Sequence, residues 1–134
     1  MSDVKEKYEN MLDNFLKHRR NIRETQRTYE EKLREHRYEL AYLLSCDILK
    51  NGGYFLSKKI EYSIDFRATL GFSEYMAAIN SYFPSAELEE IGYSFMNVHY
   101  DVLDYAARDV LSAHFTVDYR KSDLGQHVVV RTRN

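Results

Sequence analysis

Acid–base chemistry is suggested by only one stretch of this sequence, in which histidine, tyrosine and aspartate side chains cluster. The stretch contains His99, Tyr100, Asp101, Asp104, Tyr105, Asp109 and His114. A helix would spread these side chains around its circumference, so that Asp101 points away from His99. Asp104 is better placed to pair with Arg108, four residues later. A catalytic base must lie within about 3 Å of the proton that it takes. Because the spacing provides no such pair, we expect that the protein is not an enzyme.

Metal and cofactor sites are also not indicated by the residues that could form them. The five histidines are His18, His36, His99, His114 and His127. No two of them are three or four residues apart, which is the spacing that places two imidazoles on one helix face. The single cysteine, Cys46, removes thiolate sites, and its apolar surroundings predict a buried structural thiol. The sequence has no phosphate-binding glycine loop and no glycine-flanked serine. We therefore expect no metal and no cofactor.

The composition is that of a folded protein with one domain and an extension. The chain has 134 residues, of which 44% are hydrophobic and 30% charged, and its formal net charge is −2. No apolar run approaches the roughly 20 residues that a membrane span needs, and the first residues lack the apolar region of a signal peptide. We therefore expect a cytoplasmic protein with no membrane contact. The net charge gives no overall attraction to nucleic acid.

A long amphipathic helix is the strongest structural signal. Residues 1–51 contain no glycine and no proline. Apolar side chains recur three or four residues apart, at Val4, Tyr8, Met11, Phe15, Ile22, Tyr29, Leu33, Leu40 and Leu44. A continuous helix from residue 3 to 50 would be roughly 70 Å long, whereas a compact domain of this size has a radius of gyration of about 14 Å. The pattern therefore predicts either a homo-oligomer or a break, which capping patterns would place near 21–28.

The rest of the chain predicts a compact α+β domain. Asn51-Gly52-Gly53 is typical of a helix stop and divides the chain into a helical segment, 1–51, and a domain, 52–134. Three strands are predicted at 59–67, 115–120 and 127–133, a short helix at 72–83 with Ser73 as its N-cap, and a long helix at 85–114. The predicted fold is a long N-terminal helix followed by a three-stranded antiparallel sheet that packs against one long and one short helix.

Two sets of apolar side chains indicate how the sheet and the helices of this domain pack. Alternation in the first strand predicts that Ile60, Tyr62, Ile64 and Phe66 face the helices. The face of the long helix expected to cover the sheet carries Leu88, Ile91, Phe95, Val98, Val102, Ala106 and Ala113. A second strip on the same helix, with Tyr93, Tyr100 and Leu111, is a candidate interface. Apolar residues on two sides of one helix again favour oligomerisation.

The first helix also carries a basic ridge formed by Arg20, Arg23, Arg27 and Arg34, which lie within roughly 60° of one another on the helical wheel. Such a ridge could follow a phosphate backbone. Glutamates are interleaved with it, and Glu30 with Arg34, or Glu24 with Arg27, would form favourable pairs on a solvated coiled-coil flank. We favour the second interpretation.

The functional hypothesis is a non-enzymatic, homo-oligomeric protein-interaction module that acts as a regulator, adaptor or inhibitor of another macromolecule, for which we expect another protein. The predicted oligomer seam contains Tyr8, Met11, Phe15, Ile22, Tyr29, Leu33 and Leu40. Two alternatives stay open: nucleic-acid association through the arginine ridge, and a small-molecule pocket, lined by tyrosines, between the sheet and the third helix.

Overall fold

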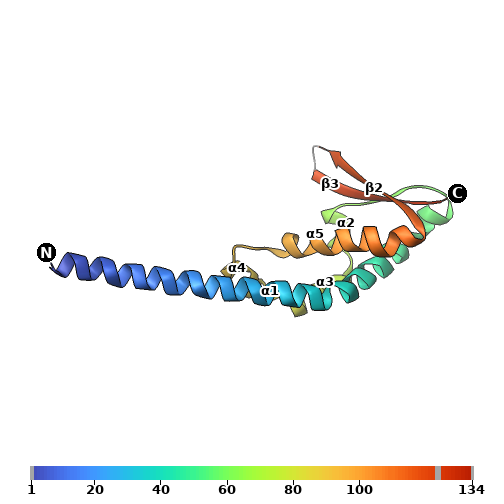
Figure 1. Ribbon diagram of the computed structural model, residues 1–134. Helices are drawn as coiled ribbons and strands as arrows, with labels where there is room; N and C mark the ends of the chain where they lie inside the picture. The colour runs from blue at the N-terminus through green and yellow to red at the C-terminus, as the bar shows by residue number, and fades with distance from the viewer. Residues whose placement is uncertain (1, 123–124, 134) are drawn as a thin grey trace.

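The protein is one long helix on whose C-terminal half a small α+β body is built, as a computed structural model of residues 2–122 and 125–133 shows (Figure 1). The helices are α1 (Ser2–Ser57), α2 (Phe66–Thr69), α3 (Ser73–Tyr82), α4 (Ser85–Glu90) and α5 (Phe95–Tyr105). The strands β1 (Tyr62–Ile64), β2 (Phe115–Ser122) and β3 (Gly125–Thr132) form a sheet in the order β1-β3-β2. The predicted α+β class, with its long N-terminal helix and three-stranded antiparallel sheet, is confirmed.

Helix α1 is continuous for 56 residues, about 84 Å at 1.5 Å per residue. Every residue from Asp3 to Asn21 is exposed, and this segment, here called the arm, projects away from the body (Figure 1). The break considered near residues 21–28 does not occur. The hydroxyls of Thr25 and Thr28 instead donate to the carbonyls of Asn21 and Glu24, each at 3.0 Å, within the helix.

Gly52 and Gly53 do not stop the first helix, so the predicted boundary at residue 51 lies inside α1. Gly52 is needed because a Cβ there would lie 2.5 Å from the Cδ2 atom of Tyr62, whose ring packs on the helix. The helix ends at Ser57, and Lys59, two residues later, adopts the left-handed conformation with φ 60°. The Ile60 N–H donates to the Phe55 carbonyl at 2.8 Å, and the Lys59 N–H donates to the Leu56 carbonyl at 3.0 Å. These two bonds form a Schellman motif.

Strand β1 is three residues long, shorter than the predicted 59–67. It pairs with β3 along Tyr62–Ile64, opposite Val130, Val129 and Val128. Ile64 is fully buried and Tyr62 is partly buried, as alternation predicts. The prediction for Ile60 is wrong, since this residue belongs to the turn that ends α1 and its side chain is 51% exposed. Phe66 begins α2, and its side chain lies outside the described part of the structure.

The predicted short helix is found as α3, at residues 73–82, but Ser73 is not its N-cap. The N-cap position is Phe72, which offers no side-chain acceptor. The buried carboxylate of Asp47, on α1, takes over this role, because its Oδ2 accepts a hydrogen bond of 3.2 Å from the Tyr75 N–H. The start of α3 is thus held directly by α1.

The predicted long helix at 85–114 is interrupted. α4 ends in a second Schellman motif, with Gly92 at φ 73° and a 2.8 Å hydrogen bond from the Tyr93 N–H to the Leu88 carbonyl. α5 then begins at Phe95, where the Ser94 N–H donates to Asn97 Oδ1 at 2.9 Å. Beyond Tyr105 the backbone widens into a π turn at Ala106–Val110 and tightens into a 3₁₀ turn at Leu111–Ala113.

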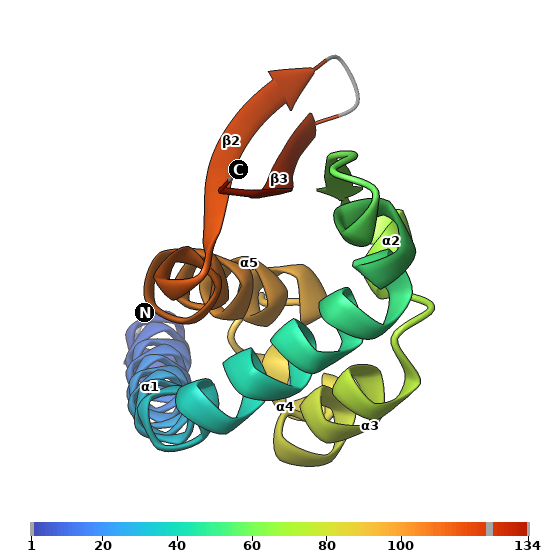
Figure 2. The same cartoon turned by 90° about the vertical axis from the view of Figure 1, so that its right-hand side faces the viewer.

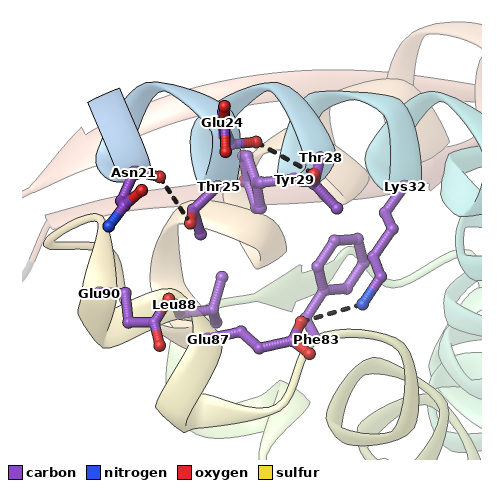
Figure 3. Close-up of a pocket in the computed structure, with 10 residues that line it drawn as sticks. All are labelled: Asn21, Glu24, Thr25, Thr28, Tyr29, Lys32, Phe83, Glu87, Leu88 and Glu90. Atoms are coloured by element: carbon purple, nitrogen blue, oxygen red, sulfur yellow. Dashed lines mark hydrogen bonds and ion pairs between the residues drawn. The ribbon is translucent and has the colours of Figure 1, made fainter. Parts of the chain in front are cut away.

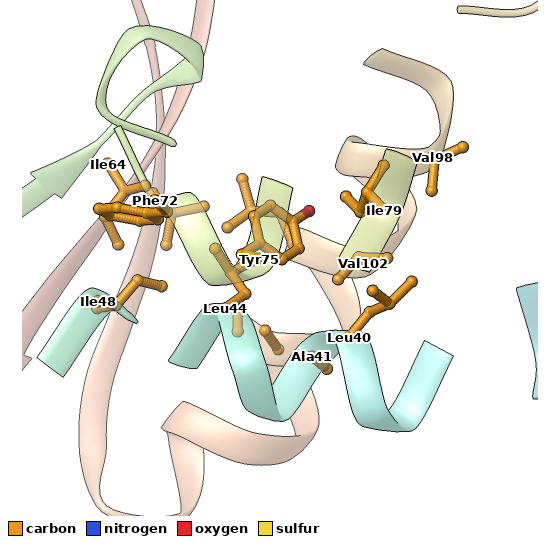
Figure 4. Packing of buried hydrophobic residues seen from close by; sticks show 14 of the residues in the cluster. Leu40, Ala41, Leu44, Ile48, Ile64, Phe72, Tyr75, Ile79, Val98 and Val102 are labelled. Carbon is orange, nitrogen blue, oxygen red and sulfur yellow. The ribbon is translucent and has the colours of Figure 1, made fainter. Parts of the chain in front are cut away.

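The hydrophobic core lies between α1, α3 and α5, and it continues to β1 and β3. Figure 4 shows Val98 and Val102 of α5 beside Ile79 of α3 and Leu40 of α1. The α5 face predicted to cover the sheet therefore faces helices instead. The opposite side of α5, with Leu103, faces the β2–β3 hairpin, which lies above α5 in Figure 2 while α3 and α4 lie on the other side. Ala113, at the end of the 3₁₀ turn, is exposed.

Substitution of the two adjacent glycines should have opposite effects on stability. Gly52→Ala places a methyl group against the Tyr62 ring and should lower the free energy of unfolding by about 1–3 kcal/mol. Gly53→Ala meets no atom within 4 Å and should raise it by about 0.5–1 kcal/mol, because alanine favours the helix. Urea denaturation of the two variants measures both effects. If both variants lost the same free energy of unfolding, the helix would end at Gly52-Gly53, contrary to the structure.

Candidate functional site

The arm presents a bare apolar surface. Six large apolar side chains on it are between 40% and 72% exposed: Val4, Tyr8, Met11, Leu12, Phe15 and Leu16. Four of them, Val4, Tyr8, Met11 and Phe15, belong to a stripe whose spacings alternate between four and three residues and which continues through His18, Ile22, Thr25 and Tyr29. This is the heptad spacing of a helix that packs against another helix. Contiguous exposed apolar surface of this kind is typical of protein–protein interfaces, membrane interaction sites and ligand-binding grooves.

The other half of the predicted oligomer seam belongs to the body. Leu33 and Leu40 are buried in the core, and Tyr29 is partly buried. The Tyr29 ring meets Phe83 and Tyr93 edge-on, at centroid distances of 5.6 Å and 5.1 Å. Burial, assisted by the Asp101 carboxylate, raises the pKa of Tyr29 to about 12. The apolar stripe is therefore covered by its own chain from Tyr29 onward and uncovered before Ile22.

The predicted second interface is only partly available. Leu111 is buried, and Tyr93 packs on Tyr29 as described above. Tyr100 is 47% exposed and lies at the edge of a small cavity between α5 and the hairpin. That cavity has a volume of about 80 Å³, far below the roughly 300–1,000 Å³ of typical ligand pockets. The cavity found at the place suggested for a small-molecule pocket is thus smaller than a typical ligand pocket.

The four arginines of the predicted ridge, Arg20, Arg23, Arg27 and Arg34, are exposed, and none of them forms an ion pair within the described residues. The pairs expected with Glu24 and Glu30 are thus not formed. By contrast, Arg37 binds Asp101 through two hydrogen bonds, of 2.7 Å and 3.2 Å, and fastens α1 to α5. The ridge is therefore separate from the ion pairs that hold the body together.

A groove lies at the base of the arm, between α1 and α4, with a volume of about 640 Å³ (Figure 3). Ten residues line it: Asn21, Glu24, Thr25, Thr28, Tyr29, Lys32, Phe83, Glu87, Leu88 and Glu90. Lys32 crosses it at one end, where Nζ donates to the Tyr82 carbonyl at 3.2 Å and to Glu87 at 2.9 Å. Glu24 and Glu90 have no ion-pair partner in the described part of the chain.

The sequence alone could not predict this groove, because its walls come from segments about 60 residues apart. The relevant local signal is Gly92, which ends α4 as a separate short helix. The groove shares Thr25 and Tyr29 with the apolar stripe of the arm. The bare stripe therefore runs directly into a concave, mainly polar surface.

The acid–base cluster is dispersed, as its spacing predicts. Asp101 binds Arg37, and Asp104 pairs with Arg108 at 3.0 Å while accepting a 2.9 Å hydrogen bond from the Tyr119 hydroxyl. His99 points into the core. Over residues 2–122 and 125–133, no group of three or more histidine, cysteine, aspartate or glutamate side chains is placed to hold a metal ion. Cys46 is exposed, contrary to expectation, because it lies on the outer side of α1.

His99 is a fully buried titratable group in the core of the body. Its side chain is 0% exposed, and its Nδ1 is joined to the Tyr75 hydroxyl by a hydrogen bond of 2.7 Å. The ring stacks on Phe95 at a centroid distance of 5.5 Å. Burial lowers the pKa of His99 to about 4 and raises the pKa of Tyr75 well above its ordinary value. At neutral pH the pair is an uncharged, enclosed hydrogen bond.

The comparisons with known proteins add no relative. No protein-family model matches the sequence, and it matches no curated protein and no solved structure. Among the helices described, none is both long enough and apolar enough to cross a membrane.

The buried imidazole should make stability depend on pH between about 4 and 6.5. The pKa of His99 in the folded chain lies below its ordinary value of 6.5, so in this range the unfolded chain binds the proton more strongly. The free energy of unfolding should fall by on the order of 3 kcal/mol as the pH drops through this range. His99→Gln can keep a hydrogen bond to Tyr75 but cannot titrate, so it should lose this part of the dependence. The urea midpoints of the unmodified protein and of His99→Gln at pH 4.5 and pH 7 measure this pH dependence. If both proteins lost the same stability between pH 7 and pH 4.5, His99 would not be its source.

Proposed function

We propose that this chain is a non-enzymatic, cytoplasmic interaction module that self-associates through its arm and regulates, adapts or inhibits another protein. The observation that carries the proposal is the exposed apolar stripe of the arm, which has heptad spacing and no cover from its own chain. A helix segment of about 20 residues is marginally stable in water unless its apolar face is packed. Association with another helix would supply that packing.

Tyrosines on the outside of the body support binding to a second macromolecule. Tyr38 and Tyr42 are exposed neighbours on α1, joined by a 3.0 Å hydrogen bond between their hydroxyls. Tyr54, Tyr100 and Tyr119 are exposed elsewhere on the body. Tyrosine offers a large apolar area with a polar tip and is enriched in protein interfaces. None of these five tyrosines belongs to the apolar stripe of the arm.

Nucleic-acid association through the arginine ridge is the second candidate, favoured by the absence of carboxylate partners for its four arginines among the described residues. The net charge of −2 and the neighbouring glutamates oppose it. A micromolar gel shift with a random duplex that weakens steeply with salt, and that is lost when all four arginines become Gln, would promote this candidate.

Charges placed in the stripe should separate the subunits. Phe15→Asp combined with Ile22→Asp should weaken assembly by several kcal/mol, because each change removes apolar contact and buries a carboxylate. Light scattering over a concentration series measures the loss. A matched control, Asn10→Asp combined with Lys17→Asp, places carboxylates on another side of the same arm and should leave assembly unchanged. An unmodified protein that is monomeric at high micromolar concentration would contradict the proposal.

A further inference from the structure

We infer that the occupant of the arm's stripe is a second copy of this chain, running antiparallel, with the tip of its arm in the groove between α1 and α4. This inference rests on the proposed self-association and specifies its geometry. It makes the groove a composite site, in which the walls come from one chain and the filling side chains come from the other.

The position of the body opposes a parallel pairing in register. The face of α1 that carries Val4 to Ile22 is the same face on which the body packs from Tyr29 onward. If two chains ran parallel and in register, each body would occupy the space that the partner's helix and body need. In an antiparallel pair the two bodies lie at opposite ends, and each arm runs along the other toward the partner's body, as the projection of the arm in Figure 1 allows.

The stripe is self-complementary in this orientation. With Val4 of one chain opposite Tyr29 of the other, Tyr8 lies opposite Thr25, and the next two layers follow in step. Those layers pair Met11 with Ile22 and Phe15 with His18. All eight stripe positions between 4 and 29 are then paired. The last two layers, which contain Thr25 and Tyr29, lie at the groove, because these two residues line it.

Charge favours the same arrangement. Lys7 lies beside the stripe, on the same side of the helix as Asn21 and Thr28, which follow it by two and three heptads. Asn21 and Thr28 both line the groove. In an antiparallel pair, flanking positions on the same side of the two helices meet. Lys7 of one chain therefore approaches the groove of the other, where Glu24 and Glu90 have no ion-pair partner among the described residues (Figure 3). The free carboxylates and the incoming lysine are complementary.

The contact is large enough for a stable dimer. Each arm contributes four exposed large apolar side chains of the stripe, Val4, Tyr8, Met11 and Phe15, with Leu12 beside them, so a two-fold pair covers ten. At roughly 100 Å² for each side chain they remove about 1,000 Å² from water, since a fully buried aromatic side chain removes about 150–250 Å². The contact of each arm tip with the partner's groove adds to this area, and stable interfaces bury about 1,200–2,000 Å².

Disulfide trapping tests the orientation, in a Cys46→Ser background that removes the native exposed thiol. The double variant Tyr8→Cys, Thr25→Cys should form a covalent dimer on mild oxidation. Each single variant should not, because like positions lie about 26 Å apart along the paired arms. Within one chain the two cysteines are equally far apart, so the product is intermolecular. A covalent dimer from Tyr8→Cys alone would show parallel arms and overturn the inference while self-association stands.

A spin label outside the stripe tests the orientation of the arms without replacing a stripe residue. Glu6→Cys in the same Cys46→Ser background places the label on the outer side of the arm. The distance between labels should be roughly 35–40 Å in the antiparallel dimer and roughly 20 Å in a parallel one, from a rise of 1.5 Å per residue and a helix diameter of about 10 Å. A dimer in which the labels are roughly 20 Å apart overturns the inference, whichever variants form a disulfide. A protein that light scattering finds monomeric overturns the proposed function, and the inference with it.

Discussion

The length of α1 relative to the body is the constraint on which the rest of the structure depends. The chain after residue 57 supplies enough apolar surface to cover the helix from about Tyr29 to Leu56, and none of it reaches the residues before Asn21. The same apolar stripe therefore has two environments. In the body it is the middle of the core, and in the arm it is exposed surface whose free energy is lowered only by association.

The body is fastened to α1 by interactions that each join distant parts of the chain. Tyr62 packs on Gly52, Asp47 caps α3, and Arg37 binds Asp101 on α5. Each of these side chains meets an element at a different height along α1, so the helix acts as the common support for α3, α5 and β1. Rigid attachment of the body fixes the direction in which the arm leaves it, and it also fixes the position of the groove beside the arm.

Local periodicity was sufficient to predict the elements that depend on it. The long helix that begins near residue 3, the β2–β3 hairpin, the burial of Ile64 and the pairing of Asp104 with Arg108 all follow from spacing along the chain. Spacing left open whether that helix breaks near residues 21–28, and the structure shows that it is continuous. The helix stop at residue 51 was wrong because a glycine is also used where another element approaches closely, and only the fold shows that Tyr62 does so. The interruption at Gly92 had a local signal in Gly92 and Ser94, but the groove that it creates needs α4 and α1 together.

Hydrogen exchange of the arm, measured as a function of protein concentration, tests the central claim most directly, because an unpacked helical segment opens readily whereas a paired one does not. The amides of residues 3–21 should become more protected as the concentration rises from below to above that at which light scattering detects assembly. The amides of α3 and α5 should be unaffected, since the chain covers them itself. Strong protection of the arm in the monomer would contradict the account, and so would an arm that stays unprotected in the assembled protein.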